Sequence, residues 1–374
     1  MECLLPNSIA LPLNGDSKGL TEFSDPSLMT RPNLKSEPWP IYLLGLVNPV
    51  IVIATNLLGG FWVVSGIVYM LGIGPILDVC LGKDSQPKPP RKSGLPFEVL
   101  LWVYATVPAL AIATLLFRSA MDGPDWTTWV AALSTGLCSG ATGIIVAHEL
   151  GHKKPRSLAW WLGRFNLLLV MYLHFTTEHN HTHHKHVSTQ LDPASARKGE
   201  TLWWFVVRTI PGQFLDAAKI QSNKGKRGLA NPIYQGLLVQ LAFLAGLYVT
   251  LGMWPVCAFL LQAAFAVFLL EYINYIRHYG LQRVPNERQT ELHSWQAEQR
   301  WSRWTLLELT RHPAHHLKAS EPFWKLQPYS KAPHLPSGYY GCFWISLIPP
   351  LWNHLIQPRM PHDHDLSMTK PTDP

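Results

Sequence analysis

The sequence predicts an all-α integral-membrane protein with about six transmembrane helices and a cap on the cytosolic face that carries a histidine-rich metal site. Of the 374 residues, 47% are hydrophobic and only 15% are charged, a low charge content for a soluble protein. The apolar residues gather in runs long enough to cross a bilayer. Four clusters of histidine follow these runs or lie between them. Together these observations favour a membrane protein with a metal centre.

The chain begins with a polar stretch, residues 1–40, in which prolines recur among serines and asparagines. This composition predicts a disordered tail without the apolar core of a signal peptide. We expect the remainder, residues 41–374, to form a single membrane domain, with the cap built from residues 148–232 and 277–374.

Six apolar runs are expected to span the bilayer. The run Leu158–Phe175 is apolar but short and contains Arg164, so we expect an interfacial or re-entrant segment there. Residues Arg118–Trp126 are expected to form a short loop. The predicted spans are Ile41–Leu58, Phe61–Cys80, Phe97–Phe117, Thr128–Ala147, Tyr234–Met253 and Val256–Tyr275.

Lysine and arginine collect in loops that this arrangement places on one side of the membrane, whereas the turns at 59–60 and 254–255 carry none. The positive-inside rule then predicts that both termini and all four histidine clusters lie on the cytoplasmic side. The same loops account for the net charge of +7, and the chain shows no basic-aromatic motif, so no nucleic-acid partner is expected. The five cysteines are scattered, which argues against structural disulfides.

The histidine clusters have the spacing of metal ligands. His148 and His152 are four residues apart, as are His179 and His183, with His184 beside them. Residues four apart lie on one face of a helix. Nine imidazoles are too many for one ion, and imidazole suits iron, zinc, copper or nickel. The pattern therefore predicts a two-ion site formed by His148, His152, His179, His183, His184, His278, His312, His315 and His316.

Two other classes of protein could use part of this pattern. Residues 148–152 also satisfy the His-Glu-x-x-His pattern of zinc metalloproteases, in which Glu149 would be the general base. That reading leaves the seven other cluster histidines unexplained. A metal-ion permease should place its ligands along a path through the membrane, whereas these histidines all gather at one face.

Three acidic residues are candidates for a role beside the metals. Glu149 and Glu178 neighbour predicted ligands and are expected to accept hydrogen bonds from ligand imidazoles. Glu271 lies in the last span and is expected near the metals or in a buried polar pair. Among the remaining histidines, His174 could lie beside the centre, and surface positions are expected for His293, His334, His354, His362 and His364.

The four clusters resemble those of the integral-membrane alkane hydroxylase (alkane 1-monooxygenase) family, within the membrane fatty-acid desaturase/hydroxylase superfamily. The most specific mark is Asn274-Tyr-Ile-Arg-His278-Tyr-Gly-Leu281, and Leu191-Asp-Pro-Ala-Ser-Ala-Arg-Lys-Gly-Glu200 is also similar. The resemblance implies that the nine histidines are diiron ligands. The chain departs from the family pattern at Arg277, where Glu is common, and at Ala314, where Asp is common.

The resemblance implies a non-haem diiron monooxygenase that hydroxylates an unactivated C–H bond of a hydrophobic, alkane-, lipid- or natural-product-like substrate with O2. A desaturase or an epoxidase of the same superfamily is the alternative. Since the sequence has no Rossmann fingerprint and no Cys-x-x-Cys motif, a separate electron donor is expected, in this family rubredoxin with its reductase. The basic loops, including Lys153 and Lys154, could dock such an acidic partner. The expected location is the bacterial inner membrane or the endoplasmic reticulum.

Overall fold

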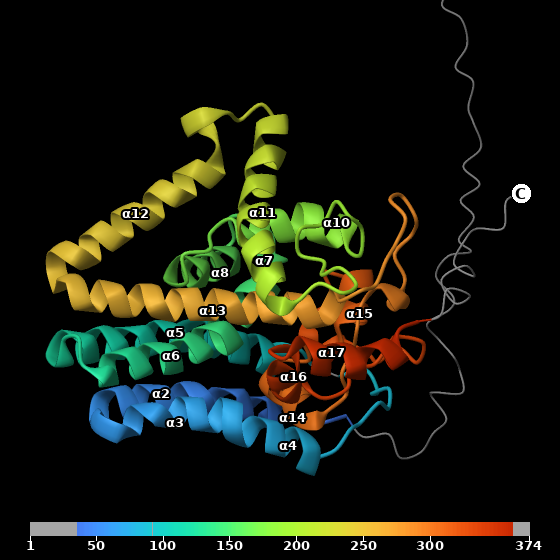
Figure 1. Ribbon diagram of the computed structural model, residues 1–374, viewed down its shortest axis with the longest axis horizontal. Helices are drawn as coiled ribbons and strands as arrows, with labels where there is room; N and C mark the ends of the chain where they lie inside the picture. Colours follow the sequence, from blue (N-terminus) through green and yellow to red (C-terminus); the bar gives the residue numbers. More distant parts are fainter. Residues whose placement is uncertain (1–35, 92, 362–374) are drawn as a thin grey trace, which may run out of the picture.

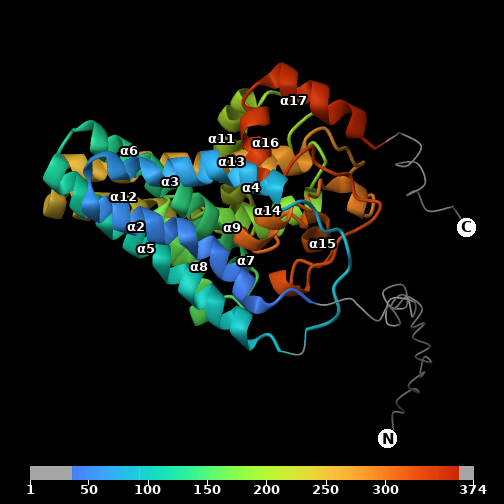
Figure 2. The ribbon, with the colours of Figure 1, turned by 90° about the horizontal axis from the view of Figure 1, so that it is seen from below.

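The computed structural model describes residues 36–91 and 93–361. Most of the predicted tail lies outside these residues, as do His362 and His364. In the described part the chain is helical, and its only β-bridges are two isolated ones. Long helices run side by side, and shorter elements gather at one end of them (Figures 1 and 2).

The six predicted spans are confirmed. Five have slightly wider bounds, because the helices continue past the apolar runs, whereas the fifth begins and ends two residues earlier than predicted. The first span starts at Trp39, and the third ends at Asp122. The spans comprise η1 (Trp39–Leu46) with α2 (Val47–Leu58); η2 (Gly60–Val64), α3 (Ser65–Ile67), η3 (Val68–Ile73) and α4 (Gly74–Cys80); α5 (Leu95–Asp122); α6 (Trp126–Cys138), η4 (Ser139–Ile144) and α7 (Ile145–Gly151); α12 (Pro232–Leu251); and α13 (Met253–His278). The chain is thus a multi-pass membrane protein.

The cap consists of short helices joined by loops. The predicted interfacial run contains α8, whose 12 residues are too few to cross a bilayer. The cap elements are α8 (Leu158–Leu169), α9 (Phe175–Glu178), η5 (His179–His183), α10 (His184–His186), α11 (Leu202–Asn223), η6 (Gly228–Ala230), η7 (Glu291–His293), α14 (Arg300–Thr305), α15 (His312–Leu317), η8 (Phe323–Lys325), α16 (Tyr339–Ser346), α17 (Pro349–Ile356) and η9 (Gln357–Arg359).

The fourth and sixth spans form the centre of the bundle, because small residues let their backbones approach closely. A Cβ atom on Gly136 would lie 2.8 Å from the carbonyl oxygen of Gln262, and one on Gly140 would lie 2.9 Å from Leu269. Ser139 donates a hydrogen bond to the Gln262 side chain at 2.8 Å. This contact brings the ends of α7 and α13, and with them His148 and His278, into one layer.

The loop expected at Arg118–Trp126 is shorter than predicted. Arg118 lies inside α5, where its guanidinium donates to the carbonyl oxygens of Asn56 and Leu57 at the end of the first span. Gly59 makes the next turn with φ +71°, and a Cβ there would lie 2.6 Å from the guanidinium. Arg118 is therefore a structural clamp at the end of the bundle opposite the histidines.

The cap is fixed to the second span through a buried carboxylate. Asp78, near the end of α4, accepts hydrogen bonds from the backbone and the hydroxyl group of Ser302 in α14. The same hydroxyl oxygen accepts from the backbone of Tyr339 at the start of α16. Asp78 therefore anchors α14 directly and α16 through Ser302.

Candidate metal centre

The structure brings together all nine histidines that the sequence singled out. They form two adjoining groups in which the candidate ligand atoms lie within 4.8 Å of one another. The rings of His184 and His316, one from each group, are 4.7 Å apart. The first group, here the five-histidine group, is His148, His152, His179, His184 and His315; the second, the four-histidine group, is His183, His278, His312 and His316.

The division of the second histidine cluster differs from the helical spacing that we expected. His179 and His183 are four residues apart, yet they belong to different groups, and His179 shares its group with His184. The reason is that residues His179–His183 form a π-helical turn. A π turn brings residues five apart into register, so the helix places residues 179 and 184 together.

The fourth cluster keeps ordinary α-helical geometry. His312 and His316 are four apart on α15 and share the four-histidine group, with their ring centroids 4.3 Å apart. His315 points to the five-histidine group, 4.4 Å from the ring of His148. The short helix α15 therefore supplies both groups.

Within each group, ring nitrogens converge on shared points. The Nε2 atom of His184 lies 3.0 Å from that of His179 and 3.1 Å from that of His315. The Nε2 atom of His312 lies 2.8 Å from that of His316. Nitrogens brought this close around shared points have the arrangement of ligands around a cation.

The protonation states also fit a metal centre. Burial lowers the pKa of His152 to about 4, and burial with the neighbouring imidazoles lowers the pKa of His179 and His184 well below the ordinary value. Neutral imidazole is the form that binds metal ions. The buried Nε2 atoms of His148 and His183 have no hydrogen-bond partner. Because an unsatisfied buried nitrogen is costly, these atoms fit a site built for cations.

Two candidate ligand rings in the four-histidine group are oriented by acceptors on their Nδ1 atoms. Nδ1 of His183 lies 2.9 Å from the buried carboxylate of Asp192, which also accepts from Ser195. Nδ1 of His278 lies 3.3 Å from the carbonyl oxygen of His293. Such partners fix the tautomer that leaves Nε2 free. Asp192 follows Leu191 in a stretch noted only as similar to the family, so its role was missed.

In the same group, the Nδ1 atom of His312 faces Arg277 and not an acceptor. Nη1 of Arg277 lies 3.0 Å from Nδ1 of His312, and its Nη2 donates to Asn274 at 2.9 Å. The guanidinium is buried at the end of α13. From the sequence, Arg277 could be recognised as a departure from the family pattern, but its contact with His312 could not be predicted.

Two of the three acidic candidates, Glu149 and Glu271, have partners other than the predicted ligands, so the hydrogen bond expected from a ligand imidazole to Glu149 is wrong. Glu149 accepts from the backbone of Phe323 at 3.2 Å, and Glu271 accepts from Tyr172, Gln213 and Asn274. One carboxylate oxygen of Glu178 is buried without a partner. Burial, with the charge of the nearby acidic groups, raises the pKa of Glu178 well above its ordinary value.

The remaining histidines follow the surface expectation only in part. His354 is exposed, but the expectation is wrong for His293, which is 1% exposed and whose ring nitrogen accepts from the backbone of Thr290. His293 caps the short helix that supplies the carbonyl to His278. His181 is exposed between the two ligand-bearing faces of its turn.

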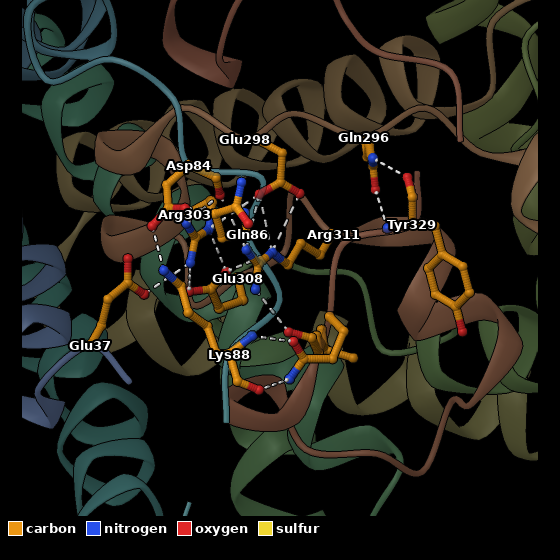
Figure 3. Close-up of polar contacts among 12 residues, drawn as sticks. Glu37, Asp84, Gln86, Lys88, Gln296, Glu298, Arg303, Glu308, Arg311 and Tyr329 are labelled. Carbon is orange, nitrogen blue, oxygen red and sulfur yellow. Dashed lines mark hydrogen bonds and ion pairs between the residues drawn. The ribbon is translucent and has the colours of Figure 1, made fainter. Parts of the chain in front are cut away.

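A buried ionic network holds the loop that precedes α15 (Figure 3). Arg303 donates to Glu308 at 2.8 Å and 2.9 Å and pairs with Glu37 at 2.9 Å. Arg311, which directly precedes His312, pairs with Glu298 at 3.0 Å. Glu308 forms ion pairs with both arginines, so the network connects Glu37, just before the first span, to the fourth histidine cluster.

An apolar cavity adjoins the centre between the spans. It has a volume of about 20 Å³, and His148 and Arg277 are the polar residues in its wall. A second apolar cavity of about 40 Å³ shares Gly140 and Ile273 with it. The two cavities are therefore neighbours, and residues of the spans line part of each.

The fold and the site define a class: a multi-pass membrane protein with a histidine-lined metal centre at one end of its helices. Comparison with known proteins agrees. The family described as fatty acid desaturase matches residues 124–346, more than half of the chain. Alkane 1-monooxygenase 1 of Pseudomonas aeruginosa is 37% identical over 323 residues, which cover 80% of this chain and 83% of that protein.

Two further relatives show the same extent of similarity. Alkane 1-monooxygenase 1 of Alcanivorax borkumensis is 31% identical, covering 87% of this chain and 85% of that protein. The xylene/toluene monooxygenase hydroxylase component of Pseudomonas putida is 31% identical, covering 84% and 86%. The chain belongs to the alkane hydroxylase family within the fatty acid desaturase superfamily, and it is an oxidoreductase of the hydroxylase class.

The ionic network predicts a pH-dependent stability. Burial alone would raise the pKa of Glu308, but Arg303 and Arg311 outweigh burial and lower it from 4.5 to about 2. The ionised carboxylate therefore stabilises the fold above pH 4.5, and this contribution is lost as the pH falls toward 2. We expect Glu308→Gln to lower stability near neutral pH, by about 3–5 kcal/mol, and to flatten the acid limb.

The measurement is the apparent Tm of detergent-purified protein between pH 3 and pH 7. Glu321→Gln, which changes a carboxylate on the cap surface, is the matched control. An unchanged profile for Glu308→Gln would show that the network does not hold the cap.

Proposed function

We propose that this protein is a diiron monooxygenase that hydroxylates an unactivated C–H bond of a hydrophobic substrate, using O2 and electrons from a separate donor. The observation that carries the proposal is the pair of adjoining groups of converging imidazoles beside an apolar cavity. Relatives named for alkanes and for xylene and toluene support a hydrophobic substrate.

The five-histidine group would hold one iron ion and the four-histidine group the other. Bound there, the iron pair supplies the chemistry that activates dioxygen for C–H oxidation. The chain orients the ligands, as Asp192 does for His183, and excludes water with the apolar wall of the cavity. An apolar substrate would enter from the lipid between the spans and reach His148 past Gly140 and Ile273, which line both cavities.

The zinc-protease alternative requires Glu149 to act as a base beside a metal-bound water. In the structure, the Glu149 carboxylate accepts a hydrogen bond from the backbone of Phe323. His148 and His152 share their group with three further histidines, where a protease needs one more ligand. Both observations favour the oxygenase.

The electrons would arrive at the surface where the centre comes closest to solvent. His152 and His184 are only partly buried. The exposed Lys154 lies two residues after His152, and the exposed Lys185 directly follows His184. Lys153 is occupied by an ion pair with Glu98 at 3.0 Å. We propose that this basic surface docks an acidic donor of the rubredoxin kind on the cytoplasmic side, in the bacterial inner membrane or the endoplasmic reticulum.

Metal content tests the centre directly. We expect about two irons per chain in gently purified protein, measured by mass spectrometry, because each histidine group offers enough nitrogens for one ion. His148→Ala and His316→Ala, one from each group, should each lose about one iron. His181→Ala is the control, because its side chain is exposed. About one zinc and no iron per chain would overturn the proposal.

The source of the oxygen in the product separates hydroxylation from desaturation. We expect turnover of an alkane or a methyl-substituted arene under ¹⁸O2, with a rubredoxin–reductase pair as donor, to give an alcohol carrying one labelled oxygen. An alkene without label would identify a desaturase, and a labelled epoxide from an alkene substrate would identify an epoxidase. Product analysis by mass spectrometry distinguishes the three.

Charge reversal tests the donor surface. We expect the double variant Lys154→Glu, Lys185→Glu to raise the KM for the donor about tenfold at low salt and to weaken its salt dependence, because it removes steering of an acidic partner. Lys219→Glu, at an exposed lysine on α11, is the matched control. If donor kinetics and iron content both stay unchanged in the double variant, the donor binds elsewhere.

A further inference from the structure

In the four-histidine group, His183 and His278 each donate a hydrogen bond from Nδ1, as metal-binding histidines usually do. Asp192 and the carbonyl of His293 can only accept, so the Nδ1 atoms of His183 and His278 carry the protons. In a neutral imidazole the other nitrogen then bears a free lone pair. Nε2 of each ring is therefore ready for a metal ion.

His312 has the opposite polarity. Its Nδ1 lies 3.0 Å from Nη1 of Arg277, and a guanidinium offers donors only. Nδ1 of His312 must therefore accept. In the neutral ring the proton is then on Nε2, the atom that faces the other ligands.

The orientation of the His312 ring is fixed by its other contacts. Nε2 lies 3.0 Å from Nε2 of His278 and 2.8 Å from Nε2 of His316. Turning the ring over would put carbon atoms at both contacts and at Arg277. With its proton on Nε2, His312 can donate to the lone pair of His278, while its Nδ1 accepts from Arg277. The single proton leaves no second hydrogen bond for the 2.8 Å contact with His316, which is the approach of two candidate ligand atoms.

Arg277 is held where it is. Its side chain is 2% exposed, its Nη2 donates to Asn274 at 2.9 Å, and its Nε donates to the carbonyl of Ile273 at 3.3 Å. Asn274 is fixed in turn by a 3.1 Å hydrogen bond to Glu271. No carboxylate among the described residues forms an ion pair with Arg277. The guanidinium cannot turn away from His312 without leaving these buried partners.

We propose that Arg277 is a positioning residue that holds His312 as a conditional ligand, so that the four-histidine group binds its metal ion more weakly than the five-histidine group. The ion is held first by His183, His278 and His316. His312 joins only when its proton moves from Nε2 to Nδ1 and the bond from Arg277 breaks. This inference rests on the proposed metal centre and assigns the two groups different affinities.

The test is a titration of the metal-free full-length protein in detergent with Co²⁺ alone, without oxygen. Visible absorption reports the coordination of each ion, and competition with a chelator gives the affinities. We expect two steps in the unaltered protein, at least about tenfold apart, since partners of ligand imidazoles change metal affinity by about 10–100-fold.

Two substitutions test whether Arg277 acts through the direction of its hydrogen bond to His312 or only through packing. Arg277→Glu supplies an acceptor for the Nδ1 proton of His312, so the weaker step should tighten about 10–100-fold. Arg277→Met removes the donor without supplying an acceptor, so the weaker step should tighten less. The step of the five-histidine group should not change, which shows that each variant is folded. Asp192→Asn should weaken the step of the four-histidine group.

The outcomes separate this inference from the proposed function. Two equal steps in the unaltered protein, or a weaker step that neither Arg277 variant tightens, would overturn the role of Arg277 and leave the two-metal centre standing. Binding of no ion would instead overturn the proposed function. The inference would be established by two unequal steps of which the weaker is tightened by both variants, and more by Arg277→Glu than by Arg277→Met.

Discussion

The structure depends on one constraint: nine neutral imidazoles must be held close together in an apolar interior with one ring nitrogen of each directed at shared points. A buried nitrogen without a partner costs about 1–3 kcal/mol, so the histidines themselves oppose the metal-free fold. The packing of the fourth span against the sixth supplies the opposing stability, through close contacts at Gly136 and Gly140. The positions of the cap and of the cavity follow from where these two spans end.

In the cap, buried ion pairs hold the histidines in place, whereas in the spans close packing does so. Leu307 and Glu308 both have positive φ values, 50° and 53°, in the loop before α15. Such conformations are unfavourable for residues other than glycine. Arg303 and Arg311 bind the Glu308 carboxylate, so the loop that aims α15 at both histidine groups is held by ion pairs that are themselves buried. This arrangement ties the ligand geometry to Glu37 at the start of the first span.

The spans and the nine histidines could be predicted because both signals are local in the sequence. Run length and composition give the spans, and four clusters of one residue type give the candidate ligands. The assignment of His183 and His184 to different groups could not be predicted, because it depends on a π turn for which the sequence has no recognisable pattern. Asp192 and the carbonyl of His293 reach the centre through loops whose paths only the fold determines.

A buried guanidinium at the end of α13 needs an explanation, since a carboxylate there would orient His312 in the usual way. The position of Arg277 in its helix explains part of this. Arg277 lies in the last turn of a 26-residue helix, where the helix dipole favours a cation and disfavours an anion by about 0.3–1 kcal/mol. The carbonyl of Ile273 and the amide of Asn274 accept two of its donors, and Asn274 relays the contact to Glu271. The charge is thus stabilised by the helix end and by neutral groups, which leaves the third donor for His312. A helix end that favours arginine therefore reverses the hydrogen bond on one ligand, and the two histidine groups differ in chemistry although they are built from the same side chain.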